Sequence, residues 1–115
     1  MDSREFLELF TSESREHLEG LGALLAKARR QELAQEEIND LFRHAHSLKG
    51  MAASMGFQPI ARLSHAMEDL LHGWRERGAA PSAATLDLLL RATDRLSAQV
   101  ETVPRAARRP WKPTS

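Results

Sequence analysis

The sequence of 115 residues contains no cysteine and no tyrosine, and only 5% of its residues are aromatic. Without cysteine the chain can form neither a disulfide nor a thiolate metal site, which fits a cytoplasmic location. So few aromatic rings offer no platform on which nucleic-acid bases could stack. The formal net charge is zero, and the apolar runs are far shorter than the ~20 residues that span a bilayer. We therefore expect neither a nucleic-acid partner nor a membrane partner.

The sequence does contain a clear helical periodicity. Four stretches place apolar residues three or four positions apart, which is the spacing of one helix face. They cover about residues 2–30, 35–55, 59–77 and 82–103. No stretch shows the sustained alternation of a strand. Four amphipathic helices with short connections predict an all-α fold, namely an antiparallel up-and-down four-helix bundle.

Residues at the helix ends and on the apolar faces make this prediction specific. Asp2 and Ser82 are suitable N-caps, Pro59 suits a first helical turn, and Gly56 and Gly78 suit helix C-termini. The predicted core consists of Phe6, Phe10, Leu18, Leu21, Leu24, Leu25, Ala28, Ile38, Leu41, Phe42, Ala45, Leu48, Ala52, Met55, Ile60, Leu63, Met67, Leu70, Leu71, Trp74, Leu86, Leu89, Leu90, Thr93, Leu96, Val100 and Val103.

The apolar pattern stops after Val103. Residues 104–115 contain three prolines and four basic residues and have no apolar period. We therefore predict a bundle domain at 1–103, followed by a basic, proline-rich linker or tail at 104–115.

One histidine of the second predicted helix, His46, lies away from the apolar face. On a helical wheel it falls roughly 120° from the centre of the apolar stripe. Gly50 and Ala53, one and two turns further on, keep the same surface small. Glycine inside a helix costs about 1 kcal/mol relative to alanine. Gly50 therefore indicates either close packing against another helix or clearance for an approaching partner.

Polar residues near His46 suggest phosphoryl chemistry. Lys49, one turn away, could stabilise a phosphorylated imidazole, although most lysines are simply solvated. The third predicted helix carries a polar stripe of Arg62, His65, Glu68 and His72. A carboxylate such as Glu68 could hold the proton on one ring nitrogen of His46 and leave the other free to attack phosphorus. The same stripe also suits an ordinary solvated helix face.

These motifs resemble histidine phosphotransfer (HPt) domains, most closely the N-terminal phosphotransfer domain of CheA-type chemotaxis histidine kinases. The matching features are the run Ala45-His46-Ser47-Leu48-Lys49-Gly50, the pair Gly56-Phe57, and the H-x-x-E spacing of His65 and Glu68. The resemblance covers about residues 3–103. It implies a bacterial phosphocarrier of a two-component signalling system.

The resemblance also implies a role for each matched residue. His46 resembles the phosphoacceptor, and Glu68 resembles the carboxylate that hydrogen-bonds it. Lys49 and His65 resemble the supporting polar partners of that network. Gly50 resembles the small residue that clears the approach to the histidine. With Ala53, it would form the surface over which a partner docks.

The implied partners are an ATP-bound CheA-type kinase catalytic domain and the receiver domain of a response regulator, whose aspartate takes the phosphoryl group. The sequence has no Gly-rich phosphate loop, so we expect no cofactor in this domain, with ATP and Mg²⁺ supplied by the kinase. Alone it would be a monomeric phosphoacceptor, and whether it counts as an enzyme depends on its being part of a histidine kinase. Members of this type usually have a fifth helix, which here would be missing or truncated.

Three other readings remain at this stage. The first is a metal-binding bundle that uses His65, Glu68 and His72 with His46, because these ligand types suit zinc. The second is a dimerising kinase module, although Ser47 follows the histidine where that family usually has an acidic residue. The third is a purely structural interaction bundle.

Overall fold

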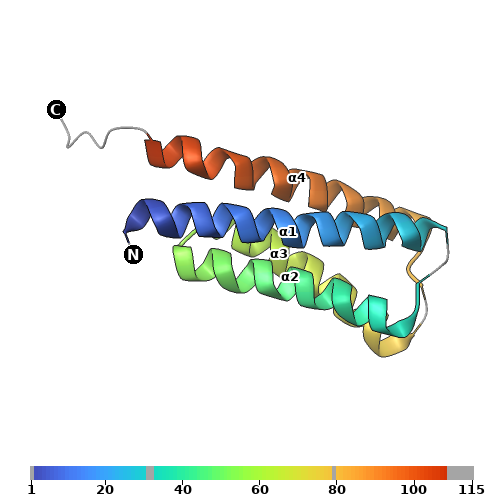
Figure 1. The fold of residues 1–115 in the computed structure, drawn as a ribbon. Coiled ribbons are helices and arrows are strands. Elements are labelled where there is room, and N and C mark those ends of the chain that lie inside the picture. Colours follow the sequence, from blue (N-terminus) through green and yellow to red (C-terminus); the bar gives the residue numbers. More distant parts are fainter. Residues whose placement is uncertain (1, 31–32, 79, 109–115) are drawn as a thin grey trace.

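Four helices make up almost all of the part of the chain that the computed structural model describes, which is residues 2–30, 33–78 and 80–108. They are α1 (Ser3–Arg29), α2 (Gln35–Met55), α3 (Gln58–Arg77) and α4 (Ala83–Arg108). Successive helices run in opposite directions and pack side by side along a body of 55 × 26 × 20 Å (Figure 1). The predicted all-α up-and-down bundle is confirmed. None of these helices is both long and apolar enough to cross a membrane.

Local signals at the helix ends act as the sequence predicts. Asp2 accepts a hydrogen bond from the backbone N–H of Glu5 at 2.9 Å, and Ser82 Oγ accepts one from the N–H of Thr85 at 3.2 Å. Each bond satisfies a backbone donor that the first helical turn leaves without a partner. Gly56 (φ 76°) and Gly78 (φ 69°) end α2 and α3 in the left-handed conformation that glycine adopts without strain.

The core follows the predicted apolar faces, with two exceptions. Phe6 and Leu70 were expected in the core but are 48% and 45% exposed. Both lie at the edge of their stripes, where a neighbouring helix no longer covers the side chain. The buried apolar residues are Phe10, Leu18, Leu21, Leu25, Ala28, Ile38, Leu41, Ala45, Leu48, Ala52, Ile60, Ala61, Met67, Leu71, Trp74, Leu89, Leu96, Val100 and Val103.

The last helix is longer than expected. α4 continues through Arg108 rather than ending at Val103, which corrects the predicted helix end. Pro104 removes one backbone donor, but the alanines and arginines after it are good helix formers, so the helix need not stop there. Residues 109–115 lie outside the described part of the chain, and the proposed division into a bundle and a tail stays a prediction.

Candidate functional site

His46 projects from α2 next to α3, and its side chain is 61% exposed. Its Nδ1 atom lies 2.5 Å from Oε2 of Glu68 on α3. An ionised carboxylate can only accept a hydrogen bond, so the proton of the neutral ring belongs on Nδ1. The Nε2 atom then keeps its lone pair. This arrangement gives a solvent-accessible nitrogen nucleophile with a defined tautomer.

Glu68 is the buried partner in this contact. Its side chain is only 10% exposed, and Oε1 accepts a hydrogen bond of 2.8 Å from Nζ of Lys49. Burial raises the pKa of the Glu68 carboxyl, but the hydrogen bonds from Lys49 and from His46 outweigh that effect. The net result is a pKa below the ordinary value, so the carboxylate is ionised at neutral pH. The structure thus joins three of the predicted site residues in one contact network.

His65 was expected to support the polar network around His46, but its side chain lies against Asp69. Its Nε2 lies 3.7 Å from Oδ1 of Asp69, one turn further along α3, and both side chains are exposed. The structure therefore pairs His65 with an acidic residue to which the sequence motifs gave no role. Support of His46 by His65 stays a prediction.

The potential metal ligands that lie close together in the structure differ from the set predicted from the sequence. Within residues 2–30, 33–78 and 80–108, the group of metal-type ligand atoms within 4.8 Å of one another is His65, Glu68 and Asp69. The predicted His72 instead accepts a hydrogen bond of 3.3 Å from Arg75. Glu68 already binds an ammonium group, with which a cation would have to compete. The cluster therefore gives no ground for assigning a metal.

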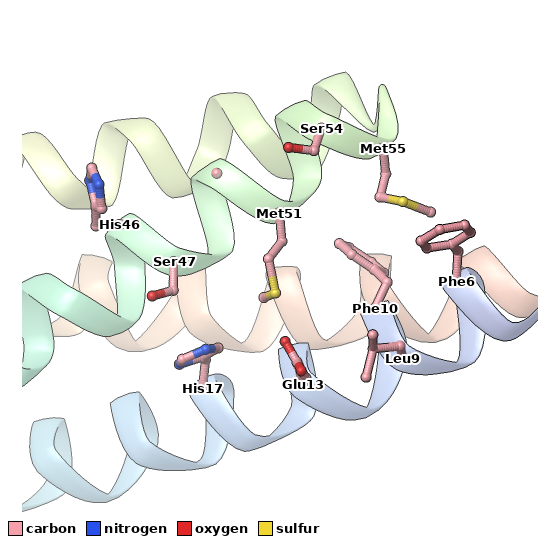
Figure 2. Close-up of a pocket in the computed structure, with 11 residues that line it drawn as sticks. Phe6, Leu9, Phe10, Glu13, His17, His46, Ser47, Met51, Ser54 and Met55 are labelled. Carbon is pink, nitrogen blue, oxygen red and sulfur yellow. The ribbon is translucent and has the colours of Figure 1, made fainter. Parts of the chain in front are cut away.

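A groove of about 570 Å³ lies beside His46, between the N-terminal half of α1 and the C-terminal half of α2 (Figure 2). Met51 of α2 and Glu13 of α1 point toward each other across it, whereas the His46 ring at its rim points away from α1 (Figure 2). The lining residues are Phe6, Leu9, Phe10, Glu13, His17, His46, Ser47, Gly50, Met51, Ser54 and Met55. The large side chains among these are mainly apolar, from phenylalanine, leucine and methionine, and the groove is open to solvent. The exposure of Phe6 thus belongs to an accessible apolar surface next to the histidine.

Gly50 belongs to this groove and has no close neighbour. Apart from its chain neighbours and the adjacent backbone of its own helix, a Cβ atom placed there would meet no atom within 4 Å. Close packing of α2 against another helix of this domain therefore does not explain the glycine. The free space is available to a molecule that approaches His46. Ala53, predicted with Gly50, is exposed on α2 but is not one of the groove-lining residues.

A second pair of histidines, for which the sequence suggested no role, joins α1 to α2. Nδ1 of His17 lies 2.9 Å from Nδ1 of His44. The ring of His44 also lies so close to Gly20 that a Cβ there would be 2.5 Å from its Nε2 atom. Burial, followed by the nearby His17, lowers the pKa of His44. Gly20 is therefore a glycine that makes room for a neighbouring side chain, unlike Gly50.

Comparison with known proteins agrees with this geometry. A family profile described as the Hpt domain matches residues 5–99. The chain belongs to the Hpt domain family. The resemblance drawn from the motifs is therefore confirmed, and the alternative of a dimerising kinase module is set aside.

Similar proteins of known name include a chemotaxis protein and a gliding motility protein. The chain is 34% identical over 103 residues to the chemotaxis protein CheA of Bacillus subtilis, covering 90% of this chain. It is 44% identical over 66 residues to a gliding motility regulatory protein of Myxococcus xanthus, covering 57% of this chain and 8% of that protein. The chain spans only 15% of the length of the Bacillus protein.

Two solved structures share the fold of this Hpt domain. The CheA phosphotransferase domain from Thermotoga maritima superposes with a TM-score of 0.82 at 31% identity, covering 90% of this chain and 99% of that one. The phosphorylated P1 domain of CheA3 in complex with CheY6 from R. sphaeroides also gives a TM-score of 0.82, at 27% identity, covering 90% and 81% of the two chains.

Proposed function

We propose that this Hpt domain is the phosphocarrier of a CheA-type two-component signalling system. In this proposal His46 accepts a phosphoryl group from an ATP-bound kinase domain and passes it to an aspartate of a response regulator. The observation that carries the proposal is the contact between Nδ1 of His46 and Glu68, which leaves Nε2 of an exposed ring free. The absence of cysteine agrees with a cytoplasmic location.

The acceptance step follows from the protonation of the His46 ring. The Nε2 lone pair attacks the γ-phosphorus, an N–P bond forms, and the P–O bond to the leaving ADP breaks. The proton stays on Nδ1, where the ionised Glu68 offsets the positive charge that the phosphorylated ring acquires. Lys49 keeps that carboxylate ionised and correctly oriented. Because the transition state of phosphoryl transfer is loose, positioning and charge supply most of the acceleration.

ATP and Mg²⁺ come from the kinase domain in this proposal. The sequence offers no Gly-rich phosphate loop and no acidic set that would hold Mg²⁺ on ATP. The domain therefore acts as a covalent carrier. We expect any kinase activity to belong to another domain of the same polypeptide or to a partner protein.

Onward transfer needs a surface on which a receiver domain can dock. The groove between α1 and α2 suits this role because it is largely apolar, open and adjacent to His46. The space over Gly50 lets a second protein approach the ring. The receiver aspartate would attack phosphorus, the N–P bond would break, and Nε2 would regain its lone pair. One of the similar structures is a phosphorylated P1 domain in complex with CheY6.

A phosphotransfer assay tests the proposal. The domain is incubated with a CheA-type kinase core and labelled ATP, and the label is tested for acid lability and mapped by mass spectrometry. We expect acid-labile label on the wild type and none on His46→Gln, with the helical circular dichroism unchanged. Label retained by His46→Gln would assign the acceptor to another residue. An unlabelled wild type would contradict a CheA-type donor.

A further inference from the structure

Phe42 lies one helical turn before His46 on α2, and the two rings stack. Their centroids are 6.0 Å apart and their planes differ by 14°. Phe42 was predicted to lie in the apolar core, and its side chain is partly buried against that core. The Phe42 ring thus packs against the edge of the core and also stacks directly on the ring of His46.

Residues of α3 hold the Phe42 ring in turn. The guanidinium carbon of Arg75 lies 3.9 Å from the centroid of the Phe42 ring, in a cation–π arrangement. The ring of His72 lies 5.9 Å from the same centroid, inclined by 50°. Arg75 also donates a hydrogen bond of 3.3 Å to Nδ1 of His72. Phe42 therefore contacts α3 through two side chains that contact each other.

The contact with Glu68 cannot fix the His46 ring by itself. A single hydrogen bond at Nδ1 holds one atom, and the ring of a largely exposed side chain could still turn about the line from Nδ1 to Oε2. Such a turn would swing the Nε2 lone pair, which lies in the ring plane, through a wide arc. A second ring packed nearly parallel to the imidazole blocks that movement.

We propose that Phe42, anchored by Arg75 and His72, is a positioning residue that fixes the plane of the His46 ring and so aims Nε2 at the incoming phosphorus. The inference rests on the proposed phosphocarrier function. Glu68 determines which nitrogen is free, and Phe42 determines where that nitrogen points. Because in-line attack requires aligned reacting atoms, a ring held in advance reduces the ordering cost of the transition state.

The test compares Phe42→Leu with Phe42→Tyr in the full chain. Leucine keeps most of the apolar bulk but removes the ring, whereas tyrosine keeps the ring. We expect Phe42→Leu to lower the rate of His46 phosphorylation by a CheA-type kinase core about tenfold, and Phe42→Tyr to recover most of that loss. Circular dichroism and thermal melting show whether each variant is folded.

An NMR measurement separates positioning from a general loss of structure. We expect Phe42→Leu to change the ring-proton shifts of His46 and to increase the mobility of its ring, measured by carbon relaxation. The Nδ1–H tautomer, read from ring nitrogen shifts, should persist because Glu68 still holds that proton. If Phe42→Leu fails to fold, Arg75→Gln tests the same anchor at a partly exposed position, with Arg75→Lys as the charge-preserving control.

Each outcome bears on a different claim. A wild type that takes up no label contradicts the proposed function itself. If the wild type is labelled and a folded Phe42→Leu variant is phosphorylated equally fast, only the positioning role of Phe42 is overturned. A tyrosine variant as slow as the leucine variant also overturns it, because the aromatic ring would then not be the property that matters. An unchanged His46 ring mobility in folded Phe42→Leu would have the same consequence.

Discussion

The ammonium group of Lys49 and the carboxylate of Glu68 form an ion pair of 2.8 Å between α2 and α3. Glu68 is nearly buried, and an unpaired buried carboxylate would favour protonation over ionisation. Lys49 thus keeps Glu68 ionised, so that both of its oxygens only accept hydrogen bonds and Oε2 accepts the one from Nδ1–H of His46. The lysine acts on the histidine through the carboxylate, in addition to any direct contact with a phosphoryl group.

Replacing Glu68 by glutamine tests this dependence. The amide keeps the size of the side chain but removes the negative charge that offsets the phosphorylated ring. We expect Glu68→Gln to slow phosphorylation of His46 by about tenfold to a hundredfold without abolishing it. Asp69→Asn, an equally conservative change at the exposed neighbouring position, is the matched control and should leave the rate unchanged. Equal rates for the glutamine variant and the wild type would show that the negative charge of Glu68 does not assist phosphorylation.

The same carboxylate makes stability depend on acidity. The folded-state pKa of Glu68 lies below its ordinary value of about 4.3. The folded protein therefore binds fewer protons there than the unfolded chain. The resulting stabilisation is complete above about pH 4.3 and is lost as the pH falls through the lower folded-state pKa.

Urea unfolding of the wild type and Glu68→Gln at several pH values measures this effect. We expect the variant to be less stable by about 1–2 kcal/mol at pH 7, and the difference to shrink below about pH 4. A difference that stays constant down to pH 3 would show that ionisation of Glu68 does not contribute to stability.

His44 is a base, whereas Glu68 is an acid, but both make the folded protein less stable as the pH falls. Burial and the facing His17 lower its pKa, with a smaller lowering by Arg43 and an opposing effect from Asp40. The unfolded chain therefore takes up a proton at His44 first, near pH 6.5, and this favours unfolding. We expect the free energy of unfolding to fall between about pH 7 and pH 5 and to fall less in His44→Gln. The exposed His65→Gln is the control, and a parallel loss in both variants would contradict the assignment.

Substitutions at two glycines with open space around them can distinguish an effect on partner docking from an effect on folding. A Cβ at Gly50 or at Gly22 would meet nothing within 4 Å. Leucine at either position should leave the fold intact. Its higher helix propensity should raise the free energy of unfolding by at most about 1 kcal/mol. We expect only Gly50→Leu to slow transfer from phosphorylated domain to a receiver domain, measured by loss of label from His46. If Gly22→Leu slows transfer equally, or neither variant does, Gly50 does not clear a docking surface.

Local features of this fold were predictable because they depend on residues close in sequence. The N-cap at Asp2, the helix ends at Gly56 and Gly78, and the apolar faces all appear where the sequence places them. The prediction was wrong for Phe6 and Leu70, since the width of a buried stripe depends on how closely the neighbouring helix approaches.

Contacts between helices were only partly predictable. Glu68 was identified as the partner of His46 because the chemistry requires a carboxylate and the motif spacing supplies one. The stacking of Phe42, held by Arg75, gave no signal, because aromatic residues at helical spacing are usually core residues. The slot that Gly20 provides for His44 depends on the relative rotation of α1 and α2, which no local pattern specifies.

All the side chains that prepare the acceptor lie on the hairpin of α2 and α3, whereas α1 contributes the opposite wall of the groove. Substitutions at Phe6, Leu9 or Glu13 can therefore reshape the docking wall without touching any residue that orients the imidazole. In this proposal α2 carries both the acceptor and one wall of the groove, whereas α1 contributes only to the docking surface. An organism with several parallel signalling routes could reassign this domain to a new receiver by changing α1 alone, while the acceptor hairpin stays as it is.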